Sequence, residues 1–112
     1  MSVTVRRINP VAVVEIVGRF TMGDAPRLLR RTVRELLNEG YKKFVFNLAR
    51  TAYLDSSGIG ELINCQALAS SQGGAVRLVH ASGKVKSLLQ VTKLVTVFEA
   101  FADEEQAVDS FK

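Results

Sequence analysis

The sequence predicts an α/β fold: a mixed, mostly parallel sheet of four to five strands with an N-terminal β-hairpin and about four helices. The hairpin is indicated by two strand-like runs on either side of Asn9-Pro10, a turn signal. After it, strand-like runs alternate with segments of helical periodicity, which favours right-handed crossovers and parallel strands. The 112 residues suit one domain, 1–112, and 47% of them are hydrophobic, enough for one core.

The first half of the chain supplies the hairpin and the first helix. Val3 to Ile8 and Val11 to Val17 are the expected strands, and Gly18 closes the second. Asp24 can cap a helix that ends before Gly40. The apolar stripe of this helix contains Ala25, Leu28, Leu29, Val33, Leu36 and Leu37, and its opposite face carries Arg27, Arg30, Arg31 and Arg34. An amphipathic helix on the surface of the sheet is therefore expected.

The second half begins with Phe44 to Leu48, a run so apolar that both faces of the strand should be covered. A loop is expected over Ala49 to Ser56. A helix over Ser57 to Gln72 should follow, with Ile59, Leu62, Ile63 and Ala67 facing inward. The remaining expected elements are a strand at Val76 to Val79, a short helix at Ser82 to Val91, a strand at Thr96 to Phe98, and a terminal helix capped by Asp103 that holds Ala107, Val108 and Phe111.

The segment from Tyr53 to Gly60, Tyr-Leu-Asp-Ser-Ser-Gly-Ile-Gly, is the most unusual in the chain. It joins the carboxyl end of a strand to a helix, the rim of an α/β sheet where ligands and partners usually bind. Gly58 and Gly60 each cost the helix roughly 1 kcal/mol relative to alanine, and close approach of another backbone is one reason to accept that cost. A flexible turn followed by an ordinary serine cap explains the same spacing.

A phosphate on Ser56 would work as a switch. It would add about −1.5 to −2 charges beside Asp55 at the start of a helix. The helix amides and dipole favour such a charge, so the domain should stay folded. A partner surface shaped for a neutral hydroxyl would reject it, so phosphorylation would abolish binding.

This segment resembles the Asp-Ser-Ser/Thr-Gly signature of the anti-sigma-factor antagonists, which are STAS domains, and the similarity extends over roughly residues 3 to 111. Features outside the signature that also match are Val14 to Gly18, Phe44 to Leu48, Gly73-Gly74, the helix with Val85, Leu88 and Leu89, and Thr92-Lys93-Leu94.

The resemblance implies a non-enzymatic protein switch without a cofactor. Ser56 matches the family's phosphoacceptor, which a cognate anti-sigma factor, itself an ATP-dependent serine kinase, phosphorylates. The unphosphorylated protein binds that kinase and frees the sigma factor, and a PP2C-type phosphatase reverses the mark. Asp55 would position the loop, and Ser57 would cap the helix and be a second candidate acceptor. The other expected contact residues are Gly58, Gly60, Leu54, Ile59 and Thr21.

Two positions depart from the family pattern. Thr21 lies where an acidic residue often follows the second strand, and Lys93 replaces a glycine before Leu94. The first change bears on partner affinity. The alternative function is therefore a STAS adaptor or subunit of a lipid-transport or signalling complex, without serine phosphorylation. In that case the arginine face of the first helix would dock an acidic partner.

Other classes of function fit the sequence poorly. A hydrolase triad would need His80, the only histidine, and there is no Gly-x-Ser-x-Gly elbow. Cys65, the only cysteine, lies within a helix and is expected to pack there rather than to react or bind metal. The net charge of +4 permits nucleic-acid binding, but no stacking motif accompanies the arginines. With no signal peptide and no apolar run near the roughly 18 residues of a membrane span, we expect a cytoplasmic protein.

Overall fold

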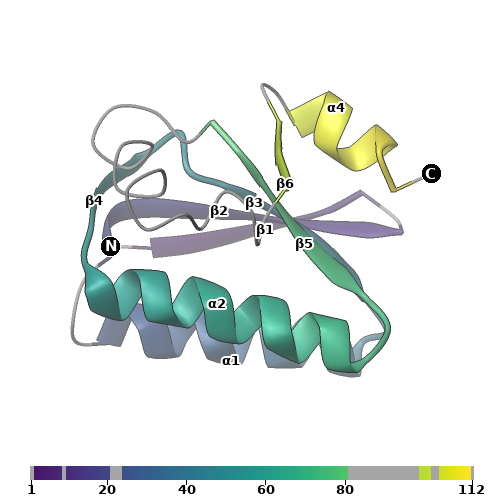
Figure 1. Cartoon of the computed structure of the whole chain (residues 1–112), viewed down its shortest axis with the longest axis horizontal. Helices are drawn as coiled ribbons and strands as arrows, with labels where there is room; N and C mark the ends of the chain where they lie inside the picture. The colour runs from purple at the N-terminus through teal and green to yellow at the C-terminus, as the bar shows by residue number, and fades with distance from the viewer. Residues whose placement is uncertain (1, 9, 21–23, 81–98, 102–103, 112) are drawn as a thin grey trace.

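A computed structural model describes residues 2–8, 10–20, 24–80, 99–101 and 104–111 (Figure 1). The elements are, in order, β1 (Ser2–Ile8), β2 (Val11–Phe20), α1 (Asp24–Asn38), β3 (Lys43–Asn47), β4 (Thr51–Leu54), α2 (Ser56–Ser71), β5 (Ala75–Val79), β6 (Glu99–Phe101) and α4 (Glu104–Asp109). The predicted α/β class is confirmed.

The sheet runs in the order β1-β2-β3-β5-β6, and β4 pairs with β2 off this path. Strands β1 and β2 form the antiparallel hairpin, with Ile8 opposite Val11. All other strand pairs are parallel, including β2 with β3 and β3 with β5. The predicted mixed, mostly parallel sheet is therefore correct, and it directs the carboxyl ends of β2, β3 and β5 to one edge.

Helices cover both faces of the sheet. Helices α1 and α2 lie side by side on one face and α4 lies on the other (Figure 1). Phe44 and Phe46 of β3 are fully buried in the core under α1 and α2. Val45, between them, packs in a second cluster with Ala107 and Val108 of α4. Since successive side chains of a strand point to opposite faces, β3 is covered on both sides, as its apolar sequence predicts.

The second strand is longer than predicted, because Gly18 bends it without ending it. Gly18 has φ +93°, a left-handed conformation that glycine adopts freely, and the pairing register shifts between Gly18 and Arg19. Beyond this bulge β2 continues to Phe20 beside β4. The predicted loop over Ala49 to Ser56 is correspondingly wrong, since it contains β4 and the first residue of α2.

The C-terminal predictions meet the structure in part. The expected helix at Ser82 to Val91 and the expected strand at Thr96 to Phe98 lie outside the described residues, as does Asp103. The described strand is β6, which follows directly at Glu99–Phe101. The terminal helix is confirmed as α4, with Ala107 and Val108 buried. No described helix is both long and apolar enough to cross a membrane.

Candidate functional site

The site is built by a short turn that carries the chain from β3 to β4. At the end of β3 the Asn47 side chain accepts a hydrogen bond from the Ala49 amide at 2.9 Å. The amide of Thr51 then donates to the Leu48 carbonyl at 3.1 Å, and its hydroxyl donates to the Ile16 carbonyl of β2 at 2.7 Å. Thr51 is nearly buried, so this hydroxyl ties the start of β4 to β2. The rim segment is therefore held by hydrogen bonds on the β2 side.

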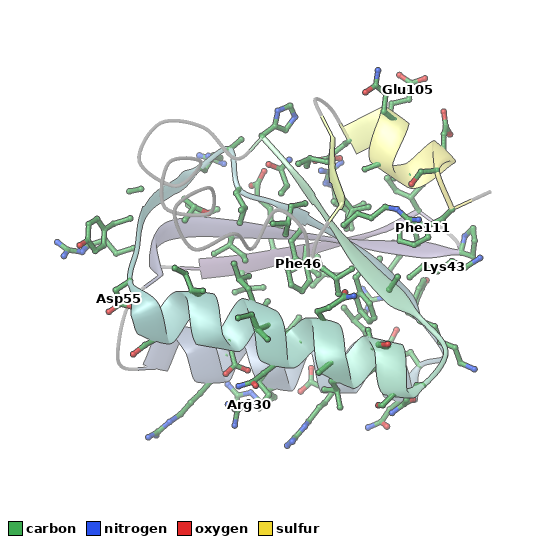
Figure 2. All side chains as sticks on the ribbon, viewed as in Figure 1. Arg30, Lys43, Phe46, Asp55, Glu105 and Phe111 are labelled. Carbon is green, nitrogen blue, oxygen red and sulfur yellow. The ribbon has the colours of Figure 1, made fainter. Side chains whose placement is uncertain are left out.

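Asp55 begins α2 as its N-cap. Its backbone is extended (φ −111°, ψ −174°), and its carboxylate accepts a hydrogen bond from the Gly58 amide at 2.9 Å. The Ile59 amide donates to the Asp55 carbonyl at 2.9 Å, the first bond of the helix. The prediction that Ser57 caps the helix is wrong, because the cap is Asp55, whose carboxylate binds the Gly58 amide that has no partner within the helix. Figure 2 shows Asp55 at the end of α2 next to β4.

The serines occupy the first turn that Asp55 starts. Ser56 is the first residue of α2, and Ser57 is the second and is solvent-exposed. The amides of a helix's first turn have no partner within the helix and point along its axis. No acidic side chain lies in this turn. The partial positive charge of the helix start is therefore opposed by Asp55 alone within the helix and its cap.

The two glycines of the segment have different surroundings. Gly58 is buried, whereas Gly60 is half-exposed, and a Cβ built on Gly60 would meet no atom within 4 Å. Internal packing does not require a glycine at 60. The surroundings of Gly60 therefore leave room for close approach from outside, and the part of Gly58 in a contact surface stays a prediction.

Helix α2 turns a different face inward than predicted at two positions. Ile59 and Leu62 are buried in the core, as the helical stripe indicates. Ile63 is 37% exposed and Ala67 is exposed, so both point outward. The inward stripe continues through Cys65 and Ala69. Ile59 is only 8% exposed, and its expected role in a contact surface stays a prediction.

Tyr53 and Arg19 are neighbours of the site that the sequence analysis did not single out. The Tyr53 ring on β4 is 43% exposed, and the Arg19 guanidinium of β2 lies 5.4 Å from its centre. Their pairing follows from the register of β2 and β4, in which the two residues are opposite. The one feature of the sequence that could have indicated Tyr53 is its place at the start of the unusual segment from Tyr53 to Gly60. Leu54 ends β4 directly before Asp55, and Thr21 lies outside the described residues.

An ion pair between a buried carboxylate and a half-exposed guanidinium joins α1 to α2 one turn below the site. Both guanidinium nitrogens of Arg30 that face α2 bind the Glu61 carboxylate, at 2.7 and 2.6 Å. The Glu61 side chain is only 4% exposed, and these hydrogen bonds raise the pKa of Arg30. Sequence patterns did not indicate Glu61, because a single acid in a helix gives no sign of burial. The pair fixes how α2 lies against α1.

Cys65 packs one turn farther along α2, below Glu61. It is fully buried in the core, and its sulfur lies 4.0 Å from Glu61 Oε1. Burial raises the pKa of the thiol to about 12. A thiol that stays protonated at neutral pH is a poor nucleophile, and the predicted packing role is confirmed. Among the residues that the structure describes, no three His, Cys, Asp or Glu side chains are grouped to hold a metal ion.

Comparison with known protein families identifies the domain that carries this site. The model of the STAS domain matches residues 2–107, nearly the whole chain. The chain belongs to the STAS domain family. The resemblance seen in the sequence is thereby confirmed at the level of the domain. No curated protein sequence is significantly similar to it.

Solved structures share the fold of this STAS domain at low sequence identity. An anti-sigma factor antagonist from Mycobacterium paratuberculosis is 19% identical, with 97% of this chain and 92% of that chain covered and a TM-score of 0.84. A putative anti-sigma factor antagonist from Thermotoga maritima is 22% identical, with 96% and 92% covered and a TM-score of 0.83. The phosphorylated form of SpoIIAA from Bacillus is 19% identical, with 99% and 100% covered and a TM-score of 0.77.

Proposed function

We propose that this STAS domain is an anti-sigma-factor antagonist, a cytoplasmic protein switch rather than an enzyme. Its unphosphorylated form binds an anti-sigma factor that is also a serine kinase, and so releases the sigma factor. The kinase transfers a phosphoryl group from ATP to Ser56 and thereby ends the binding. A PP2C-type phosphatase restores the serine.

The observation that supports this proposal most directly is the place of Ser56 at the first position of α2. Asp55, the cap, directly follows β4 and starts the helix, so Ser56 lies at the rim of the sheet and not within the helix body. A phosphate here lies beside the amides of the first turn, of which that of Gly58 is already bound to Asp55, and at the positive end of the helix dipole. The fold can therefore accept the modification.

The same phosphate changes what a partner meets. It adds about −1.5 to −2 charges next to the Asp55 carboxylate. Any acidic or closely packed partner surface must then desolvate two adjacent negative groups, which opposes binding. Exposed Ser57 and outward-facing Gly60 extend the surface that such a partner would cover. The switch works by repulsion at the interface, with the domain itself unchanged.

The comparisons support the proposal without supplying its details. SpoIIAA has been solved in an unphosphorylated and a phosphorylated form, and both share this chain's fold, with TM-scores of 0.76 and 0.77. A further neighbour is an RsbS variant from Moorella thermoacetica in which glutamate replaces a serine, with a TM-score of 0.74. The two SpoIIAA structures show this fold in an unphosphorylated and a phosphorylated state.

The proposal is tested by measuring the affinity of the chain for anti-sigma-type serine kinases from its own source. We expect Ser56→Ala to bind like wild type but to remain bound in the presence of ATP, and Ser56→Asp to bind more weakly. Ser57→Ala is the matched control for the acceptor, because it removes the neighbouring exposed hydroxyl and should still lose its binding in the presence of ATP. If wild type and both Ser56 variants bind equally and respond equally to ATP, Ser56 is not the switch.

A further inference from the structure

The arginines of this chain divide into two groups by their contacts. All nine lie within the described residues. Six contact a carboxylate or an aromatic ring: Arg6, Arg7, Arg30 and Arg50 form salt bridges, Arg19 lies over Tyr53, and Arg77 lies over Phe111. The other three, Arg27, Arg31 and Arg34, have no such partner among the described residues, and all three are on α1. We call these three residues the arginine stripe.

The arginine stripe is a straight row on the outer surface of α1. Arg27, Arg31 and Arg34 are four and three residues apart, the spacing of neighbours on one helix face, and they span about 10 Å of the axis. All three are exposed. Like charges at this spacing destabilise a helix by a few tenths of a kcal/mol per pair. Glu35, four residues after Arg31, offsets this repulsion only in part, because it is one acid beside three arginines.

The nearest buried acid does not neutralise the stripe. Glu61 of α2 is the only charged residue of that helix, and both of its oxygens are bound to Arg30. Arg30 belongs to α1 but is turned toward α2 by this pair (Figure 2). The acids of α4 are not available either, because α4 lies on the opposite face of the sheet (Figure 1).

The surface next to the stripe is the outer face of α2, which is neutral. It presents Asn64, Ala67 and Ser71, all exposed, whereas Ile63, two residues after Glu61, lies on the flank of α2 that is turned away from α1. Helices α1 and α2 pack side by side, and Arg30 opposite Glu61 sets them in register. A row of cations therefore borders a neutral face of small side chains.

We propose that the arginine stripe and the outer face of α2 dock an acidic amphipathic helix of a partner protein. Carboxylates spaced like the arginines would form bidentate pairs with them, a geometry that suits guanidinium better than ammonium. Small apolar side chains on the adjoining stripe of the partner helix would pack on Ala67. The proposal does not rest on Ser56, since its contacts are the arginines of α1 and residues of α2 from Asn64 onward, about two turns past Ser56.

Two other anionic partners fit this surface less well. A nucleic acid would extend beyond the 10 Å row, where α2 adds no cation and Glu35 of α1 adds an exposed acid. The exposed aromatic ring among the described residues, Tyr53, lies on β4 and not on this face. An anionic membrane would need more buried apolar surface than this face offers, because amphipathic surface binding scales with apolar area. Acidic protein surface is the remaining match.

The test uses a synthetic, fluorescein-labelled helical peptide of about 18 residues, long enough to hold helix in water. Its glutamates repeat the arginine spacing, alanines form the adjoining stripe, and a Glu→Gln version is the peptide control. Binding to the full chain is measured by fluorescence anisotropy. Amide shifts are mapped by NMR. We expect the shifts to fall on the outer faces of α1 and α2, and the Gln peptide not to bind.

Variants then assign the contact. Arg27→Gln with Arg34→Gln should weaken binding by roughly 2- to 30-fold, the range expected for loss of two exposed ion pairs. Lys42→Gln with Arg50→Gln removes the same charge from exposed residues outside the stripe and should change binding less than twofold. Ser56→Asp should also leave peptide binding unchanged, which separates this proposal from the proposed switch.

Several outcomes would overturn the proposal. These are an equal effect of the two double variants, amide shifts away from α1 and α2, or no binding of the glutamate peptide to folded protein. Tighter binding of duplex DNA or of phosphatidylserine vesicles through the same arginines would also overturn it, by assigning the stripe to a different class of partner.

Discussion

Replacing Gly60 by alanine should stabilise this STAS domain and weaken its proposed partner complex at the same time. Residue 60 lies inside α2, and a Cβ there would meet no atom within 4 Å. The substitution therefore brings only the helix-propensity gain, about 0.5–1 kcal/mol in the free energy of unfolding. For a chain of this size we expect Tm to rise by about 2–6 °C.

In the complex the added methyl group meets the kinase instead of solvent. Forcing a methyl into a closely packed contact costs about 1–3 kcal/mol, which corresponds to roughly 5- to 150-fold weaker binding. Thermal unfolding followed by circular dichroism gives the first quantity, and surface plasmon resonance with the cognate kinase gives the second.

Ala67 lies on the same exposed side of α2, about two turns from Gly60, and provides the matched stability control. Ala67→Gly should lower Tm by about as much as Gly60→Ala raises it, and Ser70→Ala, at an exposed position of α2 outside both proposed contact surfaces, should leave kinase binding unchanged. A fall in Tm for Gly60→Ala would refute the open surroundings of residue 60. A rise in Tm with unaltered kinase affinity would refute close approach of the partner at this glycine.

Three further predictions concern the scaffold of the site. Arg30→Met leaves the buried Glu61 carboxylate without its partner and should lower the free energy of unfolding by about 2–4 kcal/mol, whereas Glu61→Met leaves only a half-exposed guanidinium and should lower it by about 1 kcal/mol or less. Chemical denaturation measures both losses, and Arg31→Met is the neutral control. Equal losses for the two variants would contradict the burial of Glu61. Burial raises the pKa of Cys65 from 9.0 to about 12, so the thiol ionises more easily in the unfolded chain than in the folded one. The free energy of unfolding should therefore fall by up to about 4 kcal/mol as the pH rises from 9 to 12. The same pH slope in Cys65→Ala would be contrary evidence. Asp55→Ala should lower the free energy of unfolding by about 1 kcal/mol, because the hydrogen bond from the Gly58 amide is lost. Asp55→Asn should stay near wild type in thermal melts, since asparagine also caps helices. A larger loss for asparagine than for alanine would argue against the cap.

The parts of the fold that local patterns determine were predictable. The apolar stripe of α1, with Leu29, Val33 and Leu36 buried, follows from helical spacing. The apolar run of β3 correctly indicated cover on both faces. Both signals are complete within one segment, so the rest of the chain is not needed to interpret them.

Features that depend on distant segments were not predictable. Strand β4 has four residues, and it forms because β2 continues past the bulge at Gly18 to pair with it. Glu61 is buried because Arg30, 31 residues earlier, reaches its carboxylate. The orientation of Ile63 depends on which side of α2 meets the sheet. At the site, sequence alone located Asp55 and Ser56 at the helix start but assigned the cap to the wrong residue.

The central claim is that Ser56 is a phosphoacceptor, and site-mapping mass spectrometry tests it most directly. The folded chain is incubated with ATP and the anti-sigma-type serine kinases of its own source, next to Ser56→Ala and Ser57→Ala. We expect one phosphate per chain, on Ser56, retained in Ser57→Ala and lost in Ser56→Ala. Folded protein that gains no phosphate from any of these kinases, or gains it on Ser57, would show that Ser56 is not the acceptor.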